Sequence, residues 1–444
     1  MGGPRRGILP PSLLESPRWS DPMVAAAMPV ADVPFVTVGG GIGSFATVDR
    51  LRVHGVPAER IRVITDLDHP AQTYERLTRW SQLPPTARIG TGSRGRPDAP
   101  WCFPSYALEE AWRERSPRPL PGALLRRPWS PRAATVLAGL EREAARIGYA
   151  DMTVKGSVHV VRRREDGGYF TVLTGPDGAP RAYRSRYVHL AVGRPGLRLL
   201  PDLQRYRSEY GDRVRVVSAY EPHEHVYAAL RDKAGTVMVR GGGGLAARVL
   251  RRLIEDREAH GLQTRVVQAF RTVLARPSGP ERRAWQARLR DGAAHGWYHC
   301  VRGVVDLVEP GPGGRVVAHL RREGGRHQFL SDFIIDCAAL PADIAEHQVL
   351  ADLLARGGAR RGPLDRLEVA RSFEVTGAAS GDGALYASGP AALGVGVPAD
   401  TFRGLQRAAR EITADLTRRG FCPPLGPVAA TGQWLRWARG VPVR

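Results

Sequence analysis

The sequence predicts an α/β fold with parallel sheets, because two stretches of the chain repeat one pattern of strand, glycine turn and helix. The stretches are residues 35–51 and residues 236–254. In both, a short apolar run ends in three or four consecutive glycines, and helical spacing then resumes. This order is the context in which a glycine-rich turn binds a dinucleotide. We therefore expect two Rossmann-like units in one chain.

The first turn has the spacing Gly-x-Gly-x-x-small. Gly39, Gly41 and Ser44 take the three small positions, and Gly43 lies between the last two. Gly39 permits the turn, and Gly41 lets the backbone come close to a pyrophosphate, which would bind the free N–H groups and the positive end of the helix. Ser44 keeps a small side chain where helix and strand meet. The alternative is an ordinary glycine turn of an α/β domain.

An acidic residue stands at the end of the next predicted strand. That strand covers residues 60–65 and is followed by Asp66, roughly 20 positions after Ser44, as is usual in dinucleotide sites. A carboxylate at this place accepts hydrogen bonds from the ribose hydroxyls of an adenosine. Asp66 is therefore predicted to bind the adenosine part of a cofactor.

The second turn repeats the spacing of the first. Gly241 and Gly243 take the first two small positions and Ala246 the third, before a predicted helix over residues 247–254. Chance glycine turns seldom occur twice in one chain with strand and helix both in place. The repeat therefore favours a second dinucleotide site.

The two units differ where their second strands end. In the second unit the strand 264–267 leads to Gln268, and no carboxylate stands where Asp66 stands in the first. A carboxylate would repel the 2′-phosphate of NADP, whereas arginine binds it with paired hydrogen bonds. The first unit therefore suits FAD and the second NADPH, with Gln268, Arg265 and Arg271 as candidate contacts. The alternative for either arginine is an ordinary solvated side chain.

Length and cysteine usage bound the possibilities further. A chain of 444 residues is too long for one core and predicts two or three domains. The four cysteines are far apart, which argues against a disulfide scaffold or a zinc ribbon and suits a reducing cytoplasm. No apolar run approaches the roughly 20 residues that span a bilayer, so we expect no membrane span.

The formal charge of +21 raises the question of a nucleic-acid partner. Almost all of the cations are arginines, and they are spread along the chain with acids between them. A composition rich in Arg, Ala, Gly and Pro is typical of a GC-rich genome. We therefore expect no specific binding of nucleic acid.

Other segments predict the remaining elements. Residues 277–328 predict mostly loops, and His189, inside an apolar run, predicts a core histidine with satisfied hydrogen bonds. His295 and His299 have a spacing that suits zinc on a helix, but no third ligand is evident, so we expect a polar cluster and no metal. The other predicted strands are 157–162, 169–173, 187–193, 333–339 and 384–390, and the other helices are 135–147 and 401–417.

Together these residues resemble the two-dinucleotide flavoproteins, and among them the class B flavin monooxygenases and N-hydroxylases. That family carries a linker motif Phe-x-Gly-x-x-x-His-x-x-x-Tyr/Trp shortly before the second turn. Here His223 and Tyr227 match the motif, while Val217 and Ala219 stand in place of Phe and Gly. The resemblance implies that His223 and Tyr227 belong to the cofactor sites.

Two strand ends are also similar to the family. Val192-Gly193 resembles its Ala-Thr-Gly stretches without the threonine, and Gly389 ends the closing strand. Many FAD proteins have an acid after that glycine, whereas this chain has Pro390. The resemblance implies that Gly193 and Gly389 lie at the FAD.

The resemblance implies a fold and its division into domains. Two Rossmann-like domains are expected, with an FAD domain split in sequence over residues 32–205 and 345–444 and an NAD(P) domain inserted at 206–344. Residues 1–31, rich in Pro, Arg and Ser, are expected to form a disordered extension.

The resemblance also implies an activity. An enzyme of this family oxidises NADPH, reduces FAD and uses oxygen, through a flavin hydroperoxide, to hydroxylate a small molecule. One alternative is an NAD(P)H-dependent flavoprotein reductase that passes electrons to a protein or a quinone. The other is a protein that binds FAD and NAD(P) without catalysis. The sequence names no catalytic residue and predicts no oligomeric state.

Overall fold

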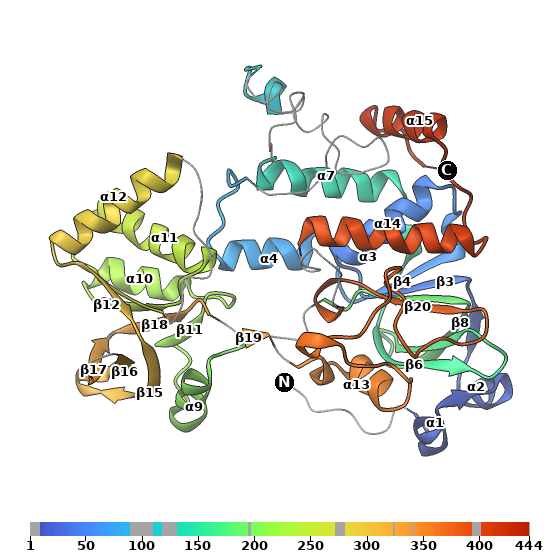
Figure 1. Ribbon diagram of the computed structural model, residues 1–444, viewed down its shortest axis with the longest axis horizontal. Coiled ribbons are helices and arrows are strands. Elements are labelled where there is room, and N and C mark those ends of the chain that lie inside the picture. The colour runs from blue at the N-terminus through green and yellow to red at the C-terminus, as the bar shows by residue number, and fades with distance from the viewer. Residues whose placement is uncertain are drawn as a thin grey trace. The chain divides into compact units, whose positions relative to one another are not determined.

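The computed structural model describes residues 9–88, 110–117, 131–193, 197–270, 280–322, 325–338, 340–341, 343–392 and 401–443. The chain forms two compact units (Figure 1). Unit 1 contains Met1–Glu75, Pro85–Pro195 and Asp343–Arg444, and unit 2 contains Arg76–Pro84 and Gly196–Ala342. Unit 1 is therefore split in sequence, with divisions close to residues 195 and 342 instead of the expected 205 and 344.

A short segment that was expected in the first domain belongs to unit 2. It is Arg76–Pro84, the second half of helix α4 (Gln72–Trp80) and the turn after it. The Ser81 carbonyl accepts a hydrogen bond of 2.9 Å from Arg248, and Gln82 bonds to Arg252. These contacts with the helix after the second glycine turn explain the assignment.

Unit 1 is built on a parallel five-stranded sheet in the order β20-β9-β3-β4-β5. Every residue of β3, β9 and β20 is buried, which accounts for the continuous apolar runs of their sequences. Helices α3 and α14, which belong to the same unit, pack against each other. The bounds are β20 Ala384–Ala387, β9 Tyr187–Leu190, β3 Phe35–Val38, β4 Ile61–Thr65, β5 Thr153–Lys155, α3 Ile42–Val53, α7 Ala133–Arg146, α8 Tyr149–Met152, α13 Gln348–Ala355, α14 Phe402–Arg418 and α15 Pro427–Ala438.

A second sheet of unit 1 has the order β1-β6-β7-β8-β2. Its three central strands are antiparallel, and the predicted strands 157–162 and 169–173 form its β6–β7 pair. Short strands from the N-terminal segment pair in parallel at both sides. The bounds are α1 Pro11–Glu15, β1 Arg18–Trp19, α2 Asp21–Ala27, β2 Val30–Asp32, β6 Ser157–Arg164, β7 Tyr169–Thr174 and β8 Pro180–Ser185.

The prediction of a disordered extension over residues 1–31 is wrong for residues 9–31. Trp19 is fully buried, and its indole N–H donates a hydrogen bond of 2.7 Å to the Leu13 carbonyl. Val24 is also fully buried, so α2 has a core-facing side. Strands of two and three residues are too short to show a period in the sequence, which is why this order was not predicted.

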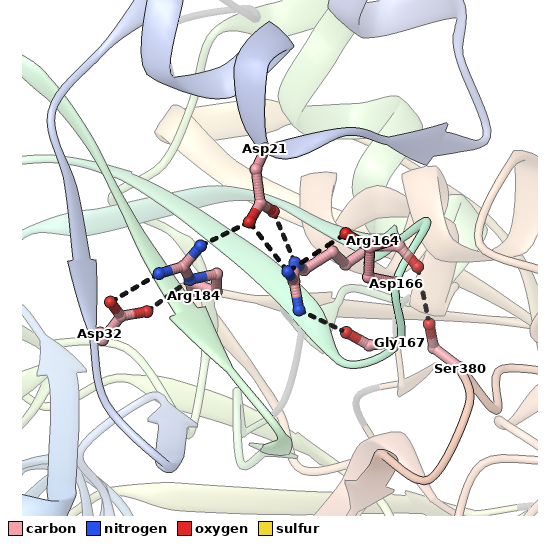
Figure 2. A network of polar contacts seen from close by, with 7 residues as sticks. All are labelled: Asp21, Asp32, Arg164, Asp166, Gly167, Arg184 and Ser380. Carbon is pink, nitrogen blue, oxygen red and sulfur yellow. Dashed lines mark hydrogen bonds and ion pairs between the residues drawn. The ribbon is translucent and has the colours of Figure 1, made fainter.

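Ion pairs hold the same segment to the sheet (Figure 2). The Asp21 carboxylate accepts hydrogen bonds from Arg164 of β6 and Arg184 of β8, and Arg184 also pairs with Asp32 of β2. The hydrogen bond from Arg164, helped by Arg184, holds the pKa of Asp21 below its usual value. One carboxylate thus links α2 to two strands.

Unit 2 contains a parallel five-stranded sheet in the order β11-β18-β12-β13-β14. The predicted helix after the second turn begins at Gly244, earlier than expected, and continues to His260. Among the described residues, no helix is both long and apolar enough to cross a lipid bilayer. The bounds are α4 Gln72–Trp80, α9 Pro201–Tyr210, β11 Val216–Ser218, α10 Glu224–Asp232, β12 Thr236–Arg240, α11 Gly244–His260, β13 Arg265–Phe270, α12 Pro280–Ala294, β14 Tyr298–Arg302 and β18 Phe333–Asp336.

The prediction of loops over residues 277–328 is wrong. The segment contains α12, β14 and most of an antiparallel sheet in the order β15-β16-β17. One face of this small sheet is buried, including Val316, Ala318 and Leu320, while the other face carries exposed polar residues. The bounds are β15 Val304–Gly311, β16 Arg315–Arg322 and β17 Gly325–Ser331, and a separate two-stranded ladder joins β10 Leu197–Arg198 to β19 Leu340–Pro341.

Candidate nucleotide-binding sites

The carboxyl ends of the parallel strands in unit 1 meet at one edge of the sheet. Val38, Ile64, Leu190 and Ala387 occupy one row of the strand register. In open α/β sheets this edge is where ligands bind. The predicted site residues that follow these strands therefore come together at it: Gly39, Asp66, Gly193 and Gly389.

Only glycine fits at position 39. The φ of Gly39 is +93°, and a Cβ added there would lie 2.4 Å from the Ala191 carbonyl oxygen. Its N–H donates a hydrogen bond of 2.9 Å to the Ile64 carbonyl. Gly39 therefore sets the turn by letting the chain pass directly beside strand β9.

The surroundings of Gly41 are open. Gly41 is the residue before α3, no side chain caps the first turn of this helix, and a Cβ added at Gly41 would meet no atom within 4 Å. Gly43 has a different surrounding, since its added Cβ would lie 3.3 Å from Leu405 and from the Ser388 hydroxyl. Gly41 thus leaves room for a ligand, whereas Gly43 lets α3 pack against α14.

Ser44 is fully buried and belongs to a polar chain beneath the turn. Its hydroxyl lies 3.0 Å from Thr37 Oγ1 and 3.4 Å from the Tyr149 hydroxyl. Tyr149 donates a hydrogen bond of 3.2 Å to the Gly40 carbonyl, and burial raises the pKa of Tyr149. The third small position of the motif therefore also supports the turn through its hydroxyl.

His189 is a core histidine with both ring nitrogens bonded, as predicted. Nδ1 lies 3.2 Å from Thr37 Oγ1 and Nε2 lies 2.8 Å from the Ser388 hydroxyl. The side chain is fully buried, and burial lowers the pKa of His189 to about 3. The imidazole is therefore neutral at physiological pH.

Two carboxylates, Asp66 and Asp68, follow β4 and differ in their surroundings. The Asp68 side chain accepts hydrogen bonds from Lys155 at 2.7 Å and from Gln72 at 3.2 Å. Asp66 is exposed, and its carboxylate makes no ion pair within the part of the chain that the structure describes. Asp66 thus has the place and the unengaged acceptor atoms that binding of a ribose requires.

Gly193 and Gly389 both have left-handed backbone conformations. Their φ values are +72° and +73°. A Cβ added at Gly193 would meet no atom within 4 Å, and one at Gly389 would lie 3.6 Å from Leu405. Pro390 forms part of a short 3-10 helix, Gly389–Ala391. The turn after β20 therefore keeps its glycine conformation without the acid that many FAD proteins have there.

The second turn repeats the geometry of the first. Gly241 has a φ of +140°, and its added Cβ would lie 3.2 Å from Cys337. Gly243 precedes α11, which has no side-chain cap, and a Cβ there would meet no atom within 4 Å. Ala246 is fully buried at the contact of helix and sheet. The three small positions thus have the same division of roles as Gly39, Gly41 and Ser44.

The Gln268 side chain holds the second turn by a hydrogen bond to its first glycine. Its Nε2 donates a hydrogen bond of 2.8 Å to the Gly241 carbonyl, and its Oε1 accepts one of 2.5 Å from the Tyr298 hydroxyl. The side chain is buried among these partners. The structure therefore gives Gln268 a role in holding the turn.

The strand register corrects the assignment of Arg265. Arg265 pairs with Thr236 at the start of β12, whereas Ala269 pairs with Arg240, next to the glycine turn. Since strand residues advance about 3.3 Å each, Arg265 lies at the wrong end of the sheet for a cofactor phosphate. The predicted strand was also too short, because β13 continues to Phe270.

Arg271 lies outside the described residues. It directly follows Phe270 in the chain, as Asp66 follows Thr65. Gly241 N–H bonds to the Ala269 carbonyl as Gly39 N–H bonds to the Ile64 carbonyl. Arg271 therefore has the sequence position in the second unit that Asp66 has in the first.

His223 and Tyr227 lie together in the core of unit 2. Each is about 1% exposed, and His223 Nε2 lies 3.2 Å from the Tyr227 hydroxyl. His223 Nδ1 lies 2.7 Å from the Glu221 carbonyl, and burial lowers the pKa of His223. The pair holds the start of α10, and its place in a cofactor site stays a prediction.

His295 and His299 form no cluster. His295 is exposed after α12, and His299 is exposed on β14. Among the described residues, no group of three or more His, Cys, Asp and Glu side chains could hold a metal ion.

Comparisons with known proteins bear on the fold. No protein-family model matches the sequence, and no curated protein matches it. Among solved structures, the chain is similar to an ornithine N-hydroxylase from Kutzneria sp. 744, with 15% identity, 88% of this chain and 100% of that chain covered, and a TM-score of 0.64. It is also similar to an L-lysine 6-monooxygenase from Pseudomonas syringae, with 14% identity, 87% and 99% coverage and a TM-score of 0.63.

The chain has the fold of the flavin N-hydroxylases. The same fold occurs in a bacillithiol disulfide reductase from Bacillus cereus, which is 16% identical over 88% of this chain and 100% of that chain, with a TM-score of 0.57. The predicted architecture of two Rossmann-like units, with the first split in sequence, is confirmed.

Three supporting residues were not predicted from the sequence. Tyr149, Tyr298 and Thr37 hold the two turns through hydroxyl groups that come from other elements. Tyr149 is separated from Gly40 by 109 positions, so no local pattern points to it. A polar residue inside the apolar run 35–38 was the one available signal, and it marks Thr37.

Proposed function

We propose that the protein is an FAD- and NADPH-dependent monooxygenase that hydroxylates a small molecule, most simply a primary amine. The observation that carries this proposal is the pair of glycine turns. Each turn precedes a helix without a side-chain cap, and each has open space at its second glycine. Two such anion sites in one chain suit two dinucleotides.

Unit 1 suits FAD. The N–H groups at the start of α3, next to Gly41, would bind the pyrophosphate, and the exposed carboxylate of Asp66 would bind the adenosine ribose. The left-handed turns at Gly193 and Gly389 bring backbone without side chains to the same edge of the sheet. The residues present therefore fit the cofactor.

Unit 2 suits NADPH. The start of α11 next to Gly243 repeats the anion site, and no acid follows β13 in the sequence. Arg271, at the position of Asp66, would bind the 2′-phosphate. We assign NADPH to unit 2 on these grounds, with Gln268 as a support of the turn.

The chemistry comes from the cofactor. When bound, FAD would supply the acceptor for a hydride from NADPH and the capacity to activate oxygen. The protein holds the cofactors, orients them and excludes water. The neighbours of known structure include enzymes named for ornithine and lysine, which supports an amine substrate here. The dispersed cysteines suit a reducing cytoplasm.

The test combines a spectrum with oxygen consumption. The purified protein, supplied with FAD, should show a flavin spectrum, oxidise NADPH and consume oxygen, and a diamine or basic amino acid should yield a hydroxylamine detectable by mass spectrometry. Absence of FAD uptake at micromolar concentration would overturn the assignment.

A second activity class is separated by the same experiment. A solved neighbour is a disulfide reductase, and a reductase would oxidise NADPH at full rate without oxygen when given a disulfide or a quinone. Oxidation of NADPH that requires such an acceptor and does not consume oxygen would assign the protein to that class.

A further inference from the structure

A chain of polar side chains runs through the interior of unit 1 beneath the first glycine turn. It passes from Ser388, after β20, through His189 of β9 and Thr37 of β3 to Ser44 of α3, with distances of 2.8, 3.2 and 3.0 Å. It continues to the Tyr149 hydroxyl and ends at the Gly40 carbonyl, at 3.4 and 3.2 Å. The five side chains are buried, and they come from four separate elements and from the residue after β20.

The Tyr149 hydroxyl is the donor at the end of this row of side chains. A carbonyl oxygen can only accept, so Tyr149 donates to Gly40 at 3.2 Å, and the same hydroxyl is the donor toward Ser44 at the longer distance of 3.4 Å. Ser44, Thr37 and His189 are joined to one another behind this hydroxyl, which keeps Ser44 beside it.

The carbonyl of Gly40 also orients the next N–H group. In a trans peptide the C=O of one residue and the N–H of the next point in opposite directions. Tyr149 is buried and holds the Gly40 carbonyl toward the interior. The Gly41 N–H is therefore turned away from the interior, and Gly41 itself has open surroundings, since an added Cβ there would meet no atom within 4 Å.

We propose that Tyr149 is a positioning residue, which holds the Gly40 carbonyl toward the interior and so aims the Gly41 N–H at the diphosphate of the cofactor. The inference rests on the proposed binding of FAD to unit 1. His189 touches neither the turn nor Tyr149. It is bonded to Thr37 of β3 and to Ser388 after β20, and so joins three neighbouring strands beneath the turn.

The test compares two tyrosine variants. Tyr149→Phe removes the bond to Gly40, and loss of one such bond at the anion site should weaken FAD binding by the apoprotein about 10-fold. Tyr169→Phe is the matched control, because Tyr169 is equally buried in unit 1 and its hydroxyl donates 2.9 Å to the Ala378 carbonyl, away from the turn. Its FAD affinity should not change. Equal affinities for the two variants would overturn the proposal.

The orientation of the turn is also tested without cofactor. Carbon NMR of the apoprotein should show an upfield shift of the Gly40 carbonyl in Tyr149→Phe, because that carbonyl loses its hydrogen bond, and no shift in Tyr169→Phe. An unchanged Gly40 carbonyl in Tyr149→Phe would overturn the proposal. This readout stands even if the wild type takes up no FAD, the result that contradicts the proposed function alone.

Discussion

Asp49 of α3 and Glu143 of α7 place two carboxyl groups side by side in the interior of unit 1. They are 0% and 2% exposed. Glu143 accepts hydrogen bonds of 2.7 and 2.5 Å from Arg146. Burial first, and then the charge of Glu143, raises the pKa of Asp49 well above its usual value. Asp49 is therefore the protonated member.

This pair predicts that Asp49→Asn changes how stability depends on pH. The folded state keeps a proton on Asp49 that the unfolded state releases above its ordinary pKa of 3.8. The free energy of unfolding therefore falls as pH rises from that value toward the raised pKa, by up to about 1.4 kcal/mol per pH unit. Asparagine has no proton to lose, so the variant should lose this slope and be more stable than the wild type at pH 8.

Urea unfolding from pH 5 to pH 8 measures the effect. Asp68→Asn is the control, because Asp68 is exposed at the protein surface and should leave the slope in place. An Asp49→Asn protein that keeps the wild-type slope, or is destabilised at pH 8, would contradict the assignment.

The N-terminal segment should contribute to the stability of unit 1. Trp19→Ala removes a fully buried indole between α1, β6 and β7 and should lower the free energy of unfolding by roughly 3–5 kcal/mol. Trp112→Ala is the control, since Trp112 is 86% exposed. Thermal melts of the two variants should differ by many degrees, and similar melts would mean that the segment contributes nothing.

Gly41 and Gly39 should separate ligand binding from folding. Gly41→Val should fold, because the space at Gly41 is open, but its side chain would occupy the place of the pyrophosphate and abolish FAD uptake. Gly39→Val should fail to fold, because its side chain would collide with the Ala191 carbonyl. Apoprotein melting and FAD titration distinguish the two, and normal FAD content in Gly41→Val would show that the turn is only structural.

Arg271 should set the preference for NADPH over NADH. A partly exposed arginine–phosphate pair contributes roughly 1.5–3 kcal/mol, which corresponds to about a 10- to 150-fold preference. Arg271→Ala should raise the Michaelis constant for NADPH and leave that for NADH nearly unchanged. Arg265→Ala should change neither, because Arg265 lies at the other end of β13. A wild type that uses NADH equally well would contradict the assignment of unit 2.

The sequence predicted the parts of the site that are local in the chain. Both glycine turns follow strands whose residues are buried on both faces, so the pattern of an apolar run, glycines and a helix was visible directly. The chain of side chains beneath the first turn was not visible, because Ser388 and His189 are 199 positions apart. The edge strands β1 and β2 were missed because two or three residues show no period.

The insertion of unit 2 within unit 1 also sets an order of events during synthesis. The glycine turn of unit 1 leaves the ribosome early. Strand β20 and Ser388 are synthesised about 190 residues after Pro195, when the segment Gly196–Ala342 of unit 2 has already been made. At translation rates of roughly 5–20 residues per second, the nascent turn waits on the order of ten seconds or more for its last strand. Unit 2 can fold within that interval, so the inserted unit should be native before the one that surrounds it.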